Sequence, residues 1–350
     1  MQVMFVWYHY FRASETYNFI RVFIACYVWM TGFGNFSFFW VRQDYSVWRL
    51  LKMLFRLNFL VLLVAAVTAN CYMLYYICAM HTYWFLSVYA MMATLPSWNS
   101  CRYRMAAKLA CYFVVNAAIF ETPLREVAFR PLWFVFEYEG SLREWLFRAG
   151  LDRYAAFVGM LCAYNYPHYE RFMNYLDKKH LSRADYISTV VIKLFLCGLV
   201  AVALAIWYDE VARREKYDYN AHHPYTSWVP VLGFILLRNM FPGLRSRYLG
   251  LFAFLGKITL ETYIAQLHIY MQFAAKKLIV FIPGYPLMNF ALGTVIYLAV
   301  AHQLFHLTID VSAFLLPKDM KAVLVNFVTA AVVVGLHVCI AFLCKEVGMV

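Results

Sequence analysis

The chain has 350 residues, of which 64% are hydrophobic and only 14% are charged. Soluble domains are about half apolar, so this composition excludes a soluble globular protein and predicts an all-α, polytopic integral membrane protein. The formal net charge of +12 does not indicate nucleic-acid binding, because the Lys and Arg residues are scattered in short segments between apolar runs, where membrane topology and anionic lipid account for them.

Apolar segments of near membrane-spanning length follow one another along the chain. We expect crossings at residues 17–40, 55–70, 71–95, 109–120, 150–166, 186–208, 228–240, 248–270, 286–307 and 323–344. They predict a bundle of about ten transmembrane helices in a single domain, residues 1–350, without a soluble esterase-like domain. The N-terminus lacks the pattern of a removable signal peptide. Lys and Arg occur on both apparent sides of the membrane, so the sequence alone leaves the orientation open.

The first span carries polar groups on one helical face. Arg21, Gly32 and Asn35 share this face with small residues, a pattern that suits close helix packing. Arg21 lies one turn inside the membrane, where it either snorkels to the interface or binds a phosphate. Further on, PLWFVF at residues 131–136 is too short to cross and is interpreted as a re-entrant or interfacial segment.

Two histidines and one aspartate stand out in the middle of the chain. His81 lies among aromatic residues in the third span and is either a neutral core residue or a catalytic group. Asp152 either caps the helix that follows it or belongs to a site. The segment around His223, Tyr225 and Trp228 predicts a structured turn at a membrane interface, where a soluble substrate is met.

The stretch GKITLETYIAQLHIYMQ, residues 256–272, concentrates ionisable groups in an apolar segment. On one continuous helix, Lys257, Glu261, His268 and Gln272 form a polar stripe, with Lys257 and Glu261 one turn apart. Intramembrane ionisable residues mark either a structural network that ties helices together or a pathway for a reaction or substrate.

Metal binding is not expected. His302 and His306 are four residues apart on a helix, but two histidine ligands alone make a weak metal site, and the nine cysteines form no CxxC pair. The chain also lacks a GxSxG elbow, a Walker phosphate loop and a GxGxxG fingerprint, which excludes the common soluble hydrolases, nucleotidases and dehydrogenases. Any chemistry is therefore expected inside the membrane.

Several ordered motifs resemble one known family. They are HYFRASETYNFIRVFIACYVWMTGFGN (9–35), RLNFLV (56–61), LYYICAMHT (74–82), GLDRY (150–154), HPYTSWVP (223–230), LRN (237–239) and GKITLETYIAQLHI (256–269). Together they resemble the multi-span acyltransferase domain of the Cas family, which includes the fungal capsule-structure protein, the animal sialate O-acetyltransferase and the plant reduced-wall-acetylation proteins. The resemblance extends to about residue 310. Ala79 replaces the Pro of the family's CPMHT block and leaves His81 in place.

This resemblance implies O-acetylation of glycans at the Golgi membrane, with acetyl-CoA as donor and no metal. Animal and fungal members also carry a lumenal Ser-His-Asp domain, whereas the plant members are thought to supply a separate soluble transferase. A separate lumenal transferase is thus an expected partner, beside the glycan acceptor and membrane lipid. A fragment of a longer protein is the alternative.

Acyl transfer from a thioester needs a general base or nucleophile and donors for the developing oxyanion. His268 and His81 are the predicted bases, with Glu261 fixing the tautomer of one of them and Lys257 or Tyr263 as charge partner or oxyanion donor. For CoA, Arg21, Arg56, Arg153 and Asn35 are predicted to bind, the arginines through phosphates near an interface. Two rival functions remain: a transporter of acetyl-CoA or acetyl groups, and a scaffold that supplies a separate transferase.

Overall fold

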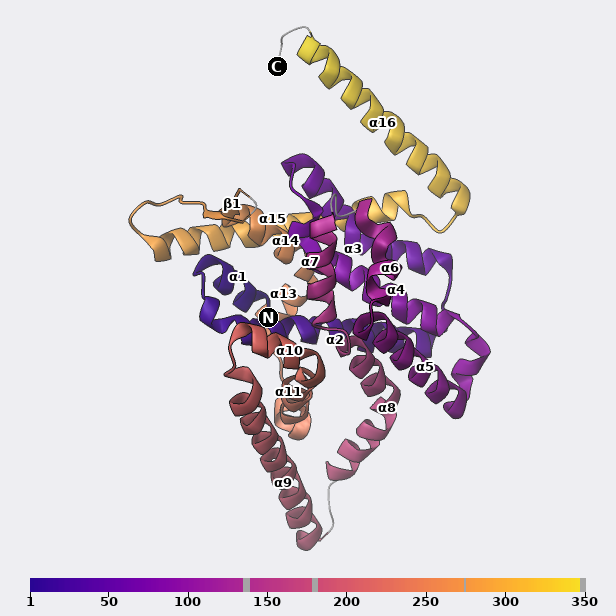
Figure 1. Cartoon of the computed structure of the whole chain (residues 1–350), viewed down its shortest axis with the longest axis vertical. Coiled ribbons are helices and arrows are strands. Elements are labelled where there is room, and N and C mark those ends of the chain that lie inside the picture. Colours follow the sequence, from indigo (N-terminus) through magenta and orange to yellow (C-terminus); the bar gives the residue numbers. More distant parts are fainter. Residues whose placement is uncertain (135–138, 178–181, 274, 347–350) are drawn as a thin grey trace.

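The computed structural model describes residues 1–134, 139–177, 182–273 and 275–346, and nearly all regular structure there is helical (Figure 1). The long elements, taking α13 with α14, are α2 (Tyr17–Arg42), α3 (Val47–Thr68), α4 (Tyr76–Ala93), α5 (Arg102–Glu121), α8 (Ala155–Leu176), α9 (Arg183–Trp207), α11 (Trp228–Met240), α13 (Gly250–Lys257), α14 (Thr259–Ile269), α15 (Pro286–Leu315) and α16 (Met320–Glu346). Each of the ten predicted crossings overlaps one of these helices or, for residues 248–270, the pair α13 and α14, although α8 continues ten residues beyond the predicted end at 166.

Shorter elements connect them. They are the helices α1 (Gln2–Tyr10), α6 (Leu124–Phe129), α7 (Glu139–Gly150), α10 (Lys216–Thr226) and α12 (Pro242–Arg245), the short turns η1 (Ser14–Thr16), η2 (Tyr72–Tyr75), η3 (Pro96–Ser100), η4 (Arg130–Phe134) and η5 (Tyr208–Ala212), and the strands β1 (Met271–Gln272) and β2 (Lys277–Leu278), which pair antiparallel.

Five helical segments of the described chain are long and apolar enough to cross a membrane on their own. They are Ser14–Arg42, Val47–Thr68, Arg183–Ala212, Pro286–Leu315 and Met320–Leu343. A sixth span results if Arg102–Glu121 and Leu124–Leu132, which meet at 93°, are taken together. This bend lies between Glu121 and Leu124, ahead of the segment 131–136 that the sequence predicted to be re-entrant or interfacial; residues 135 and 136 of that segment lie outside the described part of the chain, and the prediction stays a prediction.

Helix α2 is the central element of the bundle. It packs against α8 so closely that a Cβ atom on Gly32 would overlap the backbone carbonyl of Ala156, and one on Gly159 would overlap that of Trp29. Only glycine permits this approach, as the small residues on one face of the first span predicted. The same face of α2 buries Arg21 and Asn35 in the bundle.

The predicted continuous helix over residues 256–272 is wrong. Ile258 leaves the helical conformation at φ −101° and ψ 25°, so α13 ends at Lys257 and α14 begins at Thr259. The hydroxyl of Thr259 donates to the carbonyls of Leu255 and Gly256, which offers these acceptors an alternative to helical hydrogen bonds. Gln272 lies in β1 rather than on the helix. The polar stripe is therefore divided between two helices and a strand.

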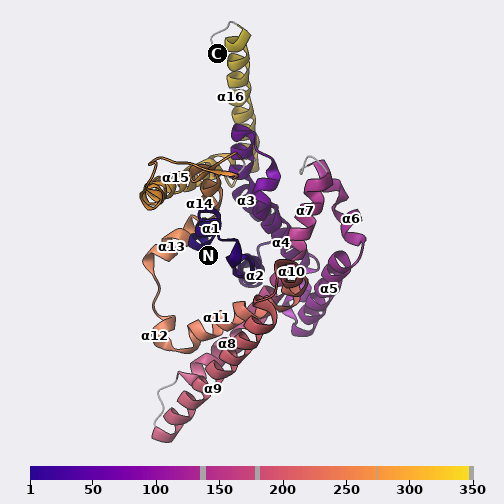
Figure 2. The same ribbon diagram turned by 60° about the vertical axis from the view of Figure 1, so that its left-hand side comes forward.

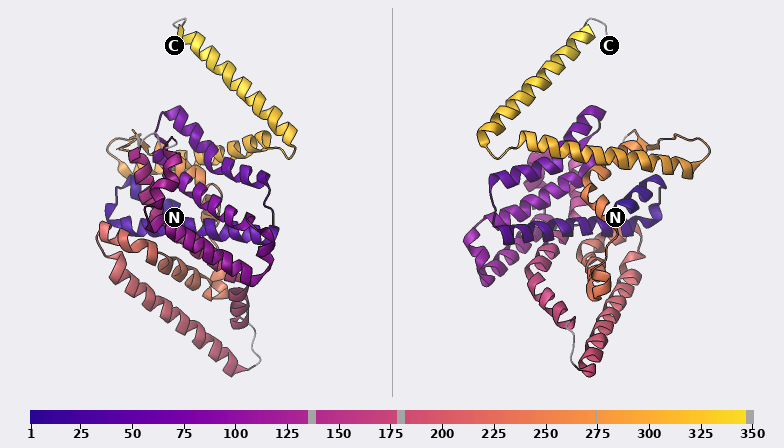
Figure 3. Two further views of the ribbon diagram at one scale, coloured as in Figure 1. Left: turned by 45° about the vertical axis from the view of Figure 1, so that its right-hand side comes forward. Right: turned by 180° about the vertical axis from the view of Figure 1, so that it is seen from behind.

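The two ends of the helix bundle carry different elements. Figure 1 shows α1 and β1 toward the left, whereas the far ends of α8 and α9 point downward. The turned views in Figures 2 and 3 show the same division, with α12 near the far ends of α8 and α9 and with α16 at the edge of the molecule. The short elements α1, α7 and α10 thus gather on one side of the bundle.

Candidate active site

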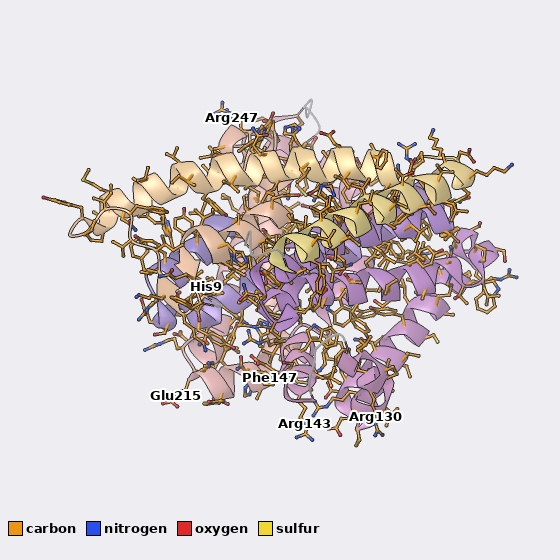
Figure 4. All side chains as sticks on the ribbon, turned by 90° about the horizontal axis from the view of Figure 1, so that it is seen from above. His9, Arg130, Arg143, Phe147, Glu215 and Arg247 are labelled. Atoms are coloured by element: carbon orange, nitrogen blue, oxygen red, sulfur yellow. The ribbon has the colours of Figure 1, made fainter. Side chains whose placement is uncertain are left out.

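A cavity of about 930 Å³ lies where α1, α7 and α10 meet the ends of α2 and α14. Figure 4 shows two of its lining residues, His9 and Phe147, away from Arg247 at the far edge of the molecule. The cavity is lined by Phe5, Tyr8, His9, Tyr17, Ile20, Arg21, Ile24, Cys71, Met73, Leu74, Tyr76, Ile77, Ser141, Glu144, Phe147, Arg148, Lys216, Tyr217, Asn220, Tyr263, Gln266, Leu267, Ala275 and Lys276. All come from the side of the bundle that carries α1, α7 and α10.

Positive charge dominates the wall of this cavity. Four basic side chains line it, Arg21, Arg148, Lys216 and Lys276, and because Arg21 is paired with Asp152 and Arg148 with Glu144, the two lysines carry the excess of positive charge. Glu144 pairs with Arg148 at 2.5 Å, on an exposed turn of α7. A cavity with this excess of positive charge attracts and holds an anionic ligand.

Arg21 belongs to a buried network at the cavity wall. Its guanidinium donates to Oδ2 of Asp152 at 2.6 Å, and the other carboxylate oxygen lies 3.3 Å from Nε2 of His223. Nδ1 of His223 lies 2.8 Å from the hydroxyl of Tyr219, which contacts the backbone of α2 through Asn18. This network ties α10 and the turn before α8 to α2.

The network also settles two alternatives left open by the sequence. The carboxylate of Asp152 does not cap α8, because both of its oxygens face Arg21 and His223. Arg21 does not snorkel, because its side chain is 3% exposed and paired. His223 lies in α10, outside the membrane-spanning helices, where burial lowers the pKa of the imidazole although Asp152 opposes the shift.

Four buried polar side chains on the cavity wall have atoms without a hydrogen-bond partner among the described residues. These atoms are Nε of Arg21, Oγ of Ser141, Nδ2 of Asn220 and both amide atoms of Gln266. Gln266 is only 1% exposed, so leaving both atoms unpaired is costly unless the cavity holds a polar ligand or water. The cavity therefore offers hydrogen bonds as well as charge.

His9 is the histidine that the structure places in this cavity, and the sequence analysis did not select it. Its side chain is reached by solvent through the cavity. Desolvation by the surrounding protein, together with the positive charge of Arg148, lowers the pKa of His9 below its ordinary value. His9 is therefore neutral at pH 7 and able to accept a proton. The motif HYFRASETYN begins at His9, and this position is the feature of the sequence that could have identified it.

The two predicted bases, His81 and His268, do not line the cavity. Nδ1 of His81 lies 2.8 Å from the hydroxyl of Thr31 in α2, and Nε2 of His268 lies 2.6 Å from the hydroxyl of Tyr75. Because the two histidines contact different hydroxyl groups, no hydrogen bond among the described residues connects His81 and His268 into one centre. Their catalytic roles stay predictions.

The predicted partnerships of Glu261 are wrong. Both of its carboxylate oxygens accept from the guanidinium of Arg56 in α3, so the carboxylate orients neither histidine. Lys257 is exposed at the end of α13 and makes no pair with Glu261, because the helix breaks between them. Tyr263 does line the cavity, and its hydroxyl donates to the backbone carbonyl of Leu74 at 3.4 Å.

The remaining predicted site residues lie outside the cavity, where they make hydrogen bonds with other protein groups. Arg153 donates to Oε1 of Glu121 at 2.7 Å and to the hydroxyl of Tyr225 at 2.8 Å, which forms a cluster outside the cavity. Trp228 donates to the carbonyl of Tyr225. The amide of Asn35 donates to the carbonyl one turn earlier in α2. Of the predicted CoA ligands, only Arg21 lines the cavity.

The described residues contain no group of three or more His, Cys, Asp or Glu side chains that could hold a metal ion. His302 and His306 contact each other through their Nε2 atoms at 3.2 Å on α15.

Comparison with known proteins identifies the family. Residues 1–328 match the model described as the 10 TM Acyl Transferase domain found in Cas1p. The zebrafish (Danio rerio) N-acetylneuraminate (7)9-O-acetyltransferase is 34% identical over 349 residues, which cover 95% of this chain and 44% of the relative. The chain thus spans less than half the length of this curated relative, and no solved structure matches. The chain belongs to the family of ten-transmembrane acyl transferase domains found in Cas1p.

Proposed function

We propose that this protein is a membrane O-acetyltransferase that transfers an acetyl group from acetyl-CoA to a hydroxyl group of a glycan at the Golgi membrane. The cationic cavity between α1, α7 and α10 is the observation that carries this proposal. Membership of an acyl transferase family supports the reaction class, and the name of the zebrafish relative supports a sugar as acceptor.

The charge of the cavity favours an acidic sugar as the acceptor. N-acetylneuraminate, which the relative's name gives as a substrate of that protein, carries a carboxylate that is ionised at neutral pH. Lys216 and Lys276 offer cationic partners for such a carboxylate, and Arg148, which Glu144 already binds through Nε and Nη2, adds its remaining Nη1 donors. The unpaired amide of Gln266 suits the hydroxyl or amide groups of a sugar.

His9 is the proposed general base. In the transfer, the sugar hydroxyl loses its proton to His9 while its oxygen attacks the acyl carbonyl, the C–S bond of the thioester breaks, and the departing CoA thiolate takes the proton from His9, which restores the neutral imidazole. The cationic wall, with Arg148 next to His9, stabilises the negative charge that develops on the carbonyl oxygen. His81 and His268 remain candidates for handling the acyl group deeper in the membrane.

The test uses the purified protein in liposomes with acetyl-labelled acetyl-CoA and N-acetylneuraminate, with the methyl ester of the same sugar as matched control. The proposal expects release of free CoA and labelled N-acetylneuraminate, and a much weaker reaction with the uncharged ester. Passage of intact acetyl-CoA across the membrane without CoA release would instead show a transporter. Equal reaction of acid and ester would contradict the role of the cationic cavity.

If neither product forms until a lumenal Ser-His-Asp transferase is added, the chain supplies acetyl groups to a separate enzyme. That outcome separates the scaffold function from self-sufficient catalysis, because the added transferase then restores labelled sugar without any change in this chain.

A further inference from the structure

A second cavity, of about 610 Å³, separates one face of α4 from one face of α5, and we call it the α4–α5 groove. Its walls are formed by α4 and the turn that follows it, from Tyr83 to Trp98, and by α5 residues from Ala107 to Ile119. Ser87 and Tyr112 bridge the two helices through their hydroxyls at 3.0 Å. The groove shares no lining residue with the cavity of the candidate active site.

The length of the groove matches one leaflet of a membrane. From Tyr83 to Thr94 an α-helix rises about 16 Å, roughly half of the ~30 Å hydrocarbon core. Because α5 begins at Arg102 and α4 ends at Ala93, the Thr94 end lies at a membrane surface and the Tyr83 end lies near the middle. The groove thus extends from the interface inward, over the depth that one acyl chain occupies.

A buried lysine lies at the interfacial end of the groove. Lys108 is 9% exposed, and its Nζ donates to the carbonyl of Thr94 at 2.8 Å and to Oδ1 of Asn99 at 2.5 Å. Asn99 is held in place by donating to the carbonyl of Met92 and to the hydroxyl of Tyr45. Among the described residues no carboxylate pairs with Lys108, so one of its three donors and its whole positive charge remain for a ligand.

The surroundings of this end have the same sign of charge. The guanidinium of Arg104 lies 5.9 Å from the ring centre of Trp98, which also lines the groove. No Asp or Glu occurs in the sequence between Asp44 and Glu121. Tryptophan beside basic residues is typical of a membrane interface, and basic pockets between transmembrane helices bind anionic headgroups.

The connections on this side of the membrane are rich in Lys and Arg. Arg42, Arg49 and Lys52 flank the connection of α2 to α3, and Arg238, Arg245 and Arg247 flank that of α11 to α13. The opposite side, which carries α7 and α10, has basic residues such as Arg148 and Lys216, but also acidic ones such as Glu144 and Glu215. The interfacial end of the groove therefore faces a membrane surface with a strong excess of basic residues, which attracts anionic lipids.

We propose that the α4–α5 groove binds an anionic glycerophospholipid of the leaflet on this side of the membrane, with one acyl chain between the two helices and the phosphate beside Lys108 and Arg104. The apolar length of the groove selects a chain, and the uncompensated lysine selects a negatively charged headgroup. This site is independent of the proposed acetyl transfer, because it requires neither acetyl-CoA nor a sugar.

The first test places a bulky side chain in the groove. Cys111 lines the groove and is exposed, and Cys339 is an equally exposed cysteine on α16, outside the groove. The purified protein is mixed with equal amounts of phosphatidylserine and phosphatidylcholine, and bound lipid is counted by native mass spectrometry. We expect Cys111→Trp to reduce bound phosphatidylserine about tenfold and Cys339→Trp to leave it unchanged. Equal retention by both variants would overturn the site.

The second test removes the charge. Lys108→Gln is compared with Lys321→Gln, an exposed lysine of α16, and with Lys108→Arg, which keeps the charge. We expect only Lys108→Gln to reduce bound phosphatidylserine, by about fivefold, without reducing phosphatidylcholine. Unchanged phosphatidylserine in Lys108→Gln would show that Lys108 only caps the end of α4, and equal binding of both lipids by the wild type would contradict an anionic ligand. If Lys108→Gln does not fold, the comparison of the two tryptophan variants decides.

Discussion

Replacing Asp152 by Asn should be among the most destabilising single changes in the protein. The carboxylate of Asp152 is fully buried, and it neutralises Arg21, whose side chain is 3% exposed, at 2.6 Å. Asn keeps the shape but removes the charge, so the guanidinium is left buried and uncompensated. Removing one partner of a buried ion pair costs about 3–5 kcal/mol.

The assay is unfolding of the detergent-solubilised protein, with Asp209→Asn as matched control. Asp209 pairs with Arg213 one turn away at 3.4 Å, but both side chains are about two-thirds exposed, at 64% and 66%. Helical surface pairs of this kind contribute about 0.3–0.5 kcal/mol. The double variant Arg21→Met/Asp152→Leu should recover part of the stability that Asp152→Asn loses, because it removes both charges. Equal stability of the Asp152→Asn and Asp209→Asn variants would refute the reasoning.

Three further predictions concern packing, pH and substrate binding. Gly159→Ala should destabilise the protein by about 1–3 kcal/mol in the same unfolding assay, because the new methyl overlaps the backbone of α2, whereas Gly34→Ala meets open space and should not. Because the pKa of His9 is lowered, kcat/KM should stay constant through neutral pH and fall only at a pH below the ordinary titration range of imidazole, as His9 takes up a proton; a rate that rises on acidification would exclude His9 as base. Arg148→Gln should raise KM for the acidic sugar about 10- to 100-fold, and the exposed Arg125→Gln should leave it unchanged.

The sequence predicted the membrane architecture well because each crossing is a local property of the chain. A run of apolar residues is enough to place a helix such as α9 or α15, and the small residues of α2 were enough to predict its close packing. The break at Ile258 was missed because the hydrophobic pattern continues across it. The hydrogen bonds of the Thr259 hydroxyl, which compete with those of a continuous helix, cannot be predicted from that pattern.

The site was predicted only in part because its contacts join residues that are distant in the sequence. Arg21 and Asp152 are separated by 131 positions, and Arg56 and Glu261 by 205. The nearest candidate partner of Glu261 along the chain, Lys257, was therefore the wrong one. His9 lies in a short polar-flanked helix that does not span the membrane, so a search for ionisable groups inside apolar spans passed over it.

The central claim is that acetyl transfer takes place in the cavity that contains His9. Its most direct test measures labelled acetyl transfer from acetyl-CoA to N-acetylneuraminate by four variants in which one histidine is replaced by Ala: His9, His81, His268, and the exposed His337 of α16 as control. The account predicts that His9→Ala lowers kcat by about 100-fold or more, the usual contribution of a general base, while the protein stays folded and His337→Ala stays fully active. Full activity of His9→Ala, with loss of activity in His81→Ala or His268→Ala, would contradict the account and move the reaction centre out of this cavity.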